Sequence, residues 1–124
     1  MFWTPAHLKF FFYRQPADMR KSFDGLCGII NGTLKEDPLS GAVYIFVNKR
    51  KDRIKLLFWD GDGFWIFYKR LEKGTFQVPD YSAEASSLEF SYDQLLLILQ
   101  GIDLRSVKRR RRYNHDVLNL PLAK

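Results

Sequence analysis

The stretch VYIFVNKRKDRIKLLFWDGDGFWIFYKRLEKGTFQVP, from Val43 to Pro79, decides the fold of this chain. It holds three apolar runs of strand length that are rich in Val, Ile, Phe, Tyr and Trp. The charged segment 48–53 separates the first two runs, and the turn sequence Asp-Gly-Asp-Gly, residues 60–63, separates the last two. Strands joined by such short turn segments predict an antiparallel β-meander. The runs are Val43–Val47, Ile54–Trp59 and Phe64–Tyr68.

Upstream of the meander, the pattern predicts one strand and one helix. Leu8 to Tyr13 is a short apolar run that favours a first strand. Between Asp18, which suits an N-cap, and Glu36, apolar residues recur at helical spacing until Asp37-Pro38 ends the pattern. We expect Phe23 to be buried between this helix and the sheet. The apolar positions of the helix are Met19, Phe23, Leu26, Cys27, Ile30 and Leu34.

Downstream of the meander, the sequence predicts a second helix. Ser91 and Gln94 have the spacing of a capping box, and Gly101 stands where a helix C-terminus favours a left-handed residue. Leu95 to Leu99 is apolar throughout, so this helix should be largely buried. The segment from Pro79 to Ser87 is a polar connection.

The meander strands are apolar on both faces, so both faces of the sheet need a cover. The helix from Asp18 to Glu36 should cover one face. The second helix should cover the other, with a partner subunit in a homo-oligomer as the alternative. We therefore predict an α+β fold, a small antiparallel meander of three to five strands packed with two helices. It forms one domain over residues 1–104, followed by a basic, flexible tail over residues 105–124.

The composition indicates a globular protein of the cytoplasm. The chain has 124 residues, of which 46% are hydrophobic and 16% aromatic, enough to build a core. No window approaches 18 uncharged apolar residues, so we expect no transmembrane helix. The N-terminal residues lack the charge-first order of a signal peptide. Cys27 is the single cysteine, which excludes an internal disulfide and favours a cytoplasmic location.

The positive charge is concentrated after the second helix. The chain has 20 basic and 14 acidic residues, a net charge of +6. Six basic residues and no acidic one lie within 105–112, and subtracting those six from 20 leaves 14 basic against 14 acidic. This pattern predicts a polyanion-binding arm, with a solvated tail as the alternative. The six residues are Arg105, Lys108, Arg109, Arg110, Arg111 and Arg112.

A second basic group occupies the connection between the first two meander strands. Lys and Arg that protrude from a hairpin can bind phosphate, and Arg beside aromatic residues can stack on unpaired bases. The alternative is a solvated turn whose lysines oppose edge pairing. We predict that this group binds DNA. Its residues are Lys49, Arg50, Lys51 and Arg53, and further candidates are Lys69, Arg70 and Lys73 near the end of the third strand, with Arg20 and Lys21, which can also pair locally with Asp18 or Asp24.

The residues that could carry catalysis are few. Asp60, Asp62 and Glu72 raise the alternative of a metal-dependent nuclease, but their spacing lacks the further ligands of a calcium loop. A tight turn that uses Asp and Gly explains residues 60–63 better. Cys27 lies on the apolar helix face, and His7 and His115 stand near the two ends of the chain. We predict a protein that is not an enzyme, with no catalytic residue, no metal site and no cofactor.

Three segments together carry a family resemblance. They are the meander, the stretch DMRKSFDGL from Asp18 to Leu26, and the stretch LLILQGID from Leu96 to Asp103. In this order the chain resembles the accessory protein TnpB of the insertion sequence sixty-six family of bacterial mobile elements, from about Pro16 to Asp103. One departure is Ser22, where many relatives carry Gly. Further matching positions are Asp37 to Gly41, Lys55, Trp59-Asp60, Gly63-Phe64, Tyr68 to Glu72, Gly74, Phe76 and Pro79.

The resemblance implies a role without implying a mechanism. It implies a small protein that is encoded beside a separate, larger transposase and is needed for transposition without being the catalyst. The RNA-guided nuclease that shares the name TnpB is a different protein, and this chain has neither its length nor its motifs. We therefore expect an accessory factor in DNA transposition that binds element DNA, the transposase, or both. A DNA-binding repressor of the element's own genes is a further alternative.

Overall fold

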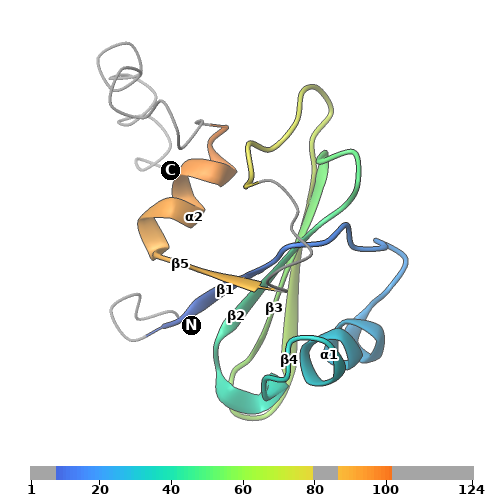
Figure 1. The fold of residues 1–124 in the computed structure, drawn as a ribbon, viewed down its shortest axis with the longest axis vertical. Coiled ribbons are helices and arrows are strands. Elements are labelled where there is room, and N and C mark those ends of the chain that lie inside the picture. The colour runs from blue at the N-terminus through green and yellow to red at the C-terminus, as the bar shows by residue number, and fades with distance from the viewer. Residues whose placement is uncertain (1–7, 80–86, 102–124) are drawn as a thin grey trace.

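The computed structural model describes residues 8–79 and 87–101, which form a five-stranded sheet with an α-helix on each face (Figure 1). The predicted α+β class is confirmed. The elements in chain order are β1 (Phe10–Tyr13), α1 (Phe23–Gly32), the 3₁₀ helix η2 (Pro38–Ser40), β2 (Val43–Val47), β3 (Arg53–Trp59), β4 (Phe64–Arg70), β5 (Ser87–Phe90) and α2 (Tyr92–Leu99).

The predicted meander is present in the centre and at one edge of the sheet. The strand order is β4-β3-β2-β1-β5, and β2, β3 and β4 pair antiparallel in sequence. The β3–β4 hairpin is in register from Trp59 opposite Phe64 at the turn to Arg53 opposite Arg70 at the far end. Its turn has the predicted form, since the Asp60 N–H donates to the Gly63 carbonyl (3.1 Å) and Gly61 has a φ of 108°.

The remaining strands make the sheet mixed, whereas the sequence analysis predicted an antiparallel one. β1 pairs parallel with β2, and β5 pairs antiparallel with the other side of β1. The parallel pair follows from the order of elements, because α1 lies between β1 and β2 and provides the long crossover that parallel neighbours require.

Each helix builds one of two cores, as predicted for a sheet that is apolar on both faces. On the α1 face, Leu26 and Ile30 pack against inward residues of β2 and β3. On the α2 face, Leu95 and Ile98 pack against β1, β2 and β3. The strand residues of the α1 core are Tyr44, Phe46 and Leu57, and those of the α2 core are Phe10, Phe12, Val43, Ile45, Val47, Ile54, Leu56, Phe58 and Phe90.

Strand β4 does not follow this rule, because the two helices do not cover it on both faces. Cover by a partner subunit, the predicted alternative, stays a prediction. Trp65, Phe67 and Tyr68 keep 51%, 43% and 51% of their surface exposed. β4 is an edge strand, and α2 lies over the side of the sheet that is farther from it (Figure 1). Neither helix therefore covers the side chains of Trp65, Phe67 and Tyr68 fully.

Helix α1 is shorter than the predicted span from Asp18 to Glu36. Asp18 is not its N-cap, because the Asp18 carboxylate accepts from the Arg20 N–H (2.9 Å) within a tight turn. The buried Lys55 ammonium donates to the carbonyls of Met19 (2.9 Å) and Lys21 (2.8 Å). A helix that began at residue 18 would need these carbonyls for its own hydrogen bonds, so α1 begins later, after Ser22.

The end of α1 and the burial of Phe23 also differ from prediction. The Glu36 N–H donates to the Ile30 carbonyl (3.0 Å), and Lys35 has a left-handed φ of 57°, which ends the helix before Asp37-Pro38. Phe23 is 44% exposed because it is the first residue of α1, and Leu26 is the first helix residue that reaches the core.

Helix α2 has the predicted signals at both ends. The Ser91 hydroxyl accepts from the Gln94 N–H (3.1 Å), and the Gln94 side chain accepts from the Ser91 N–H (2.8 Å). This reciprocal pair is the predicted capping box. Gly101 follows the helix with a φ of 79°, a conformation that favours glycine.

Candidate nucleic-acid interface

The connection between β2 and β3 is held in one shape by the side chain of Asn48. The Asn48 amide oxygen accepts from the N–H groups of Asp52 and Arg53, each at 3.0 Å. The side-chain amide nitrogen of Asn48 donates to the Asp52 carboxylate (2.7 Å). The backbone carbonyl of Asn48 accepts from the Lys51 N–H (3.0 Å). A short loop with so many internal hydrogen bonds is a defined platform for the basic side chains that it carries.

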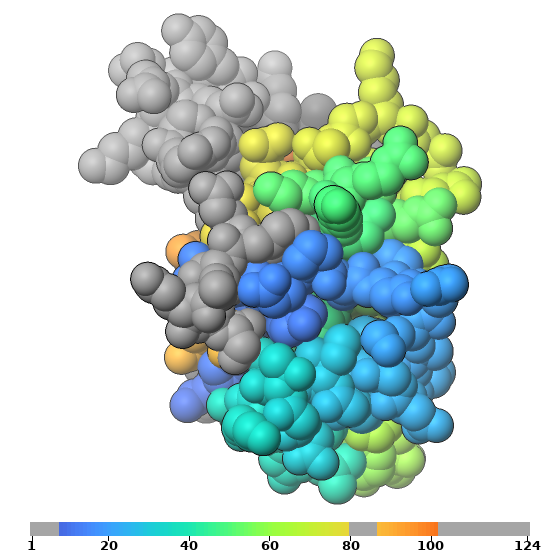
Figure 2. Space-filling model, turned by 45° about the vertical axis from the view of Figure 1, so that its right-hand side comes forward, coloured from blue at the N-terminus to red at the C-terminus, as the bar shows by residue number. Residues whose placement is uncertain are grey.

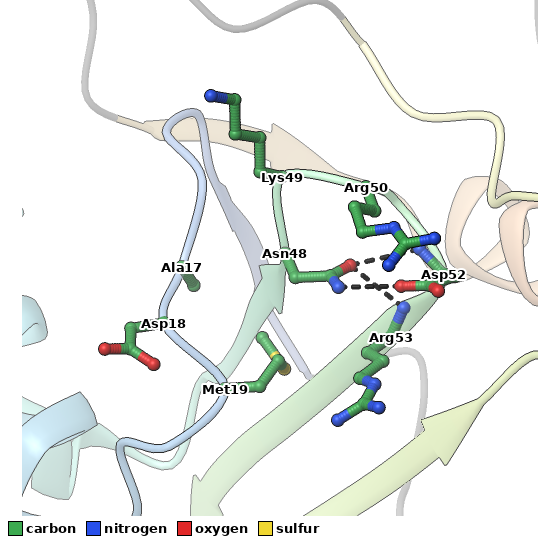
Figure 3. Close-up of a pocket in the computed structure, with 8 residues that line it drawn as sticks. All are labelled: Ala17, Asp18, Met19, Asn48, Lys49, Arg50, Asp52 and Arg53. Atoms are coloured by element: carbon green, nitrogen blue, oxygen red, sulfur yellow. Dashed lines mark hydrogen bonds between the residues drawn. The ribbon is translucent and has the colours of Figure 1, made fainter.

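The predicted DNA-binding residues Lys49, Arg50, Lys51 and Arg53 are here called the basic tip. Lys49, Arg50 and Lys51 lie on this loop, and Arg53 is the first residue of β3. Figure 3 shows Lys49, Arg50 and Arg53 pointing in different directions. The Arg53 guanidinium also donates to the Tyr68 hydroxyl on β4 (3.3 Å).

The loop that follows β4, residues 71–79, lies beside the basic tip, and further basic residues are on it and at the end of β4. The Leu71 N–H donates to the Asp52 carbonyl (2.8 Å), and the Phe76 N–H donates to the Lys51 carbonyl (2.7 Å). Phe76 is buried in the α2 core and anchors this loop. The two loops lie side by side in both views (Figures 1 and 2). The structure thus places the predicted candidates Lys69, Arg70 and Lys73 at the same end of the sheet as the basic tip.

The acidic residues at this end are already engaged. The Asp18 carboxylate pairs with Arg20 (2.8 Å), as predicted, and this hydrogen bonding lowers the pKa of Asp18 to about 2. Hydrogen bonding from Asn48 lowers the pKa of Asp52. Glu72 pairs with Arg70 (2.9 Å). Asp18 and Glu72 thus compensate Arg20 and Arg70. Lys49 and Arg50 are exposed to solvent.

A shallow pocket of about 330 Å³ lies beside the loop, lined by Ala17, Asp18, Met19, Asn48, Lys49, Arg50, Asp52 and Arg53. Its cations lie on the side formed by the loop and the start of β3, and Asp18, on the opposite side, points away from Asn48 (Figure 3). A small-molecule site needs polar groups that converge on one ligand. Cations spread around a fixed loop instead suit an extended polyanion, whose charges are spaced along a backbone.

Lys55 fixes the segment that enters α1 against the sheet. Besides its two carbonyl partners, the Lys55 ammonium lies 4.8 Å from the centre of the Tyr68 ring. It therefore joins three parts of the structure, namely the segment 18–21, β3 and β4. Because the ammonium is buried and its partners are backbone carbonyls, Lys55 holds Arg20 and Lys21 in place instead of binding a ligand itself.

Replacing Lys55 by Met is expected to lower the free energy of unfolding by about 1.5–3 kcal/mol, since it removes hydrogen bonds from a charged donor and leaves two carbonyls without it. Urea denaturation measures the loss. Lys9→Met, at an exposed position, is the control and should change stability by less than about 0.5 kcal/mol. Equal stabilities for the two variants would show that the Lys55 contacts contribute nothing.

The structure does not bring together the carboxylates of the nuclease alternative. Asp60 and Asp62 lie in the β3–β4 turn, and Glu72 follows β4 at the other end of the hairpin. Seven strand residues separate the two ends, a distance of about 20 Å. In residues 8–79 and 87–101, no three His, Cys, Asp or Glu side chains form a group that could hold a metal ion.

Several other predicted features are outside the described residues or form no site. All six basic residues of the predicted arm, Arg105 to Arg112, lie outside them, as do His7 and His115. Burial raises the pKa of the Cys27 thiol, which disfavours the reactive thiolate. Within the described ranges, no helix is long and apolar enough to cross a membrane.

The sequence analysis missed two residues that shape this interface, Asn48 and Lys55. The Asn48 side chain forms hydrogen bonds within its own loop. An Asn at the start of a turn segment often does so, and this pattern could have predicted its role. Lys55 lies between the buried apolar residues Ile54 and Leu56 of β3, and a lone lysine inside a buried strand could have indicated a specific partner.

Comparisons with known proteins cover most of this chain. Residues 8–109 match the family described as IS66 Orf2 like protein. Two relatives are uncharacterized proteins of Sinorhizobium fredii (strain NBRC 101917 / NGR234). Protein y4jC is 34% identical over 96 residues, 77% of this chain and 80% of its own length. Protein y4hO is 38% identical over 88 residues, 71% of this chain and 75% of its own length. No solved structure matches the chain.

Proposed function

This chain belongs to the IS66 Orf2-like family and is an accessory protein of an insertion element, and from that premise we propose that it supports transposition by binding the DNA of the element and the separate transposase. It does so without catalysing the reaction. The family membership sets the biological context, and the geometry of the basic tip is the observation that carries the DNA-binding part.

Three properties of the basic tip support DNA as its ligand. Its loop is fixed by the hydrogen bonds of Asn48, so the cations need little ordering on binding. Lys49 and Arg50 are exposed, and the carboxylate of Asp52 is engaged with Asn48. The side chains of Lys49 and Arg50 point in different directions, which suits phosphates spaced along a duplex better than one compact anion. Contacts of this kind position a protein on DNA without selecting a sequence.

A non-catalytic role is supported by the placement of the carboxylates. Metal-assisted cleavage of a phosphodiester needs carboxylates that converge on one or two metal ions. Asp60 and Asp62 lie at one end of the β3–β4 hairpin and Glu72 at the other. The Asp60 carboxylate instead accepts a hydrogen bond from the Trp65 indole N–H.

The transposase is the proposed protein partner. The sequence resemblance implies that the two proteins are encoded side by side, and an accessory factor that holds DNA can act by presenting it to the catalyst. The test is a pull-down of the purified transposase by this protein, with and without DNA of the element ends. Retention in either condition supports the proposal, and absence from both contradicts the transposase part.

Replacing Lys49 and Arg50 together by Gln is expected to weaken duplex DNA binding. Two fewer phosphate contacts should make the slope of log affinity against log salt shallower by about two units. Lys9→Gln with Lys35→Gln is the matched control, because both lysines are exposed and lie toward the other end of the sheet. A fluorescence anisotropy titration measures the affinities. If both double variants bind like the unaltered protein, the basic tip is not the DNA contact.

A further inference from the structure

Strand β4 presents aromatic side chains and a cation on one exposed face. Trp65, Phe67 and Lys69 alternate along the strand, so all three point to the same side of the sheet as α2. Their register partners Phe58, Leu56 and Ile54 are buried in the α2 core. The two aromatic residues keep about half of their surface exposed, at 51% and 43%. We call Trp65, Phe67 and Lys69 the β4 face.

The two rings of the β4 face are held in place before any ligand binds. The Trp65 indole N–H donates to the Asp60 carboxylate, and this hydrogen bond lowers the pKa of Asp60. The Phe67 ring contacts the buried Phe58 ring edge-on, with centroids 5.4 Å apart. Trp65 and Phe67 themselves have centroids 6.2 Å apart and planes inclined by 69°. Fixed rings offer stacking surface at a low entropic cost.

The ring spacing selects for unpaired bases. Neighbouring bases in a duplex strand rise by about 3.4 Å, and their faces are covered by each other. Rings 6.2 Å apart cannot each stack on successive bases of such a duplex. An extended single strand can place its bases farther apart, and its free base faces can each meet an aromatic side chain.

The charges around the β4 face suit a nucleic acid backbone and give it a direction. Lys69 continues the row of Trp65 and Phe67, and its exposed ammonium donates to the Leu99 carbonyl at the end of α2 (3.4 Å). Arg53 begins β3 at the same end of the hairpin. The ionised Asp60 lies at the other end and repels phosphate. A bound strand would therefore pass over the rings with its backbone directed toward Lys69 and the basic tip.

We propose that the β4 face is a stacking site for unpaired bases of single-stranded DNA, next to the duplex-binding basic tip. This inference rests on the proposed function, since it extends the DNA contact from the basic tip along β4. Together the two surfaces would hold a junction between paired and unpaired DNA, with phosphates of the duplex at Lys49 and Arg50 and unpaired bases on Trp65 and Phe67.

A second copy of the chain is the competing occupant, because β4 is an edge strand of the sheet that the described residues form, and edge strands can pair with another chain. The charges favour the nucleic acid. Two of the seven β4 residues, Lys69 and Arg70, are basic, and lysine on an edge strand opposes edge-to-edge pairing. No acidic residue stands within β4 to pair with these cations in a symmetric dimer.

The experiment compares three DNAs with the full-length protein and its variants. The probes are an all-thymine single strand of about 16 nucleotides, the upper end of the site size for one small binding domain, an abasic strand of the same length and charge, and a duplex. The variants are Trp65→Ala, Phe67→Ala and the conservative Trp65→Phe, with Leu39→Ala as the control for an exposed apolar residue outside β4, in η2. Circular dichroism verifies folding, and analytical ultracentrifugation reports self-association.

The proposal predicts that the unaltered protein binds the all-thymine strand more tightly than the abasic strand. Each of Trp65→Ala and Phe67→Ala should weaken binding of the all-thymine strand by about 5- to 150-fold, the equivalent of about 1–3 kcal/mol per stacked base. Duplex affinity should stay unchanged in both, and Trp65→Phe should retain most of the single-strand affinity. Leu39→Ala should bind all three DNAs like the unaltered protein.

Two results would overturn the proposal and would differ from a failure of the proposed function. If the unaltered protein binds duplex DNA but binds the all-thymine and abasic strands equally, the stacking site is absent while the DNA-binding function stands. If Trp65→Ala leaves single-strand binding intact and turns a dimer into a monomer, the β4 face is a self-association surface. Absence of binding to every DNA would contradict the proposed function itself.

Discussion

The Phe46→Ala variant is expected to lose about 3–5 kcal/mol of unfolding free energy. The side chain of Phe46 is fully buried on β2 in the α1 core, with its ring 5.7 Å from that of Tyr13. Removing it leaves a cavity between α1 and the sheet that the surrounding side chains only partly fill. Typical domains have 5–15 kcal/mol of stability in total, so the variant should be close to unfolding. Urea denaturation followed by circular dichroism measures the loss.

Phe23→Ala is the matched control, since it makes the same chemical change at an exposed position. Phe23 retains 44% of its surface in contact with solvent, and its truncation should cost less than about 1 kcal/mol. If Phe23→Ala destabilised the protein as much as Phe46→Ala, the structure would have misplaced the start of α1.

The elements that could be predicted from the sequence are those whose signal is local. The apolar runs of the meander, the Asp-Gly turn and the capping box of Ser91 each depend on neighbouring residues, and all three are present. The parallel pairing of β1 depends on which strand lies beside which, and a single apolar run does not contain that information. The start of α1 was also out of reach, because it depends on Lys55, which is 34 and 36 residues away from its carbonyl partners.

In the candidate interface, too, only the features with a local sequence signal could be predicted. A run of Lys and Arg between two strands predicts a basic loop, and Lys49 and Arg50 are indeed exposed on one. The position of Lys69 and Arg70 beside that loop follows from the β3–β4 register, which only the folded hairpin provides. The exposure of Trp65 and Phe67 in the single chain was out of reach, because apolar residues on both faces of a strand do not tell whether the strand lies at an edge, as β4 does.

Ending the chain at Leu104 is expected to weaken duplex DNA binding by orders of magnitude at physiological salt. This truncation removes the six basic residues from Arg105 to Arg112 and keeps all the residues that the structure describes. If four to six of these cations contact phosphates, the slope of log affinity against log salt becomes shallower by about four to five units. The loss should be similar for element-end and unrelated DNA, because phosphate contacts carry no sequence information. Unchanged circular dichroism and urea midpoint would verify that the domain itself is intact.

The most direct test of the account is a salt titration of duplex DNA binding with three proteins: the full-length chain, the chain ended at Leu104, and the full-length Lys49→Gln/Arg50→Gln variant. The account predicts a steep slope for the full-length chain, a slope shallower by about two units for the double variant, and one shallower by about four to five units for the truncated chain. Equal slopes for all three proteins would contradict it, because neither the arm nor the basic tip would then contact DNA phosphates.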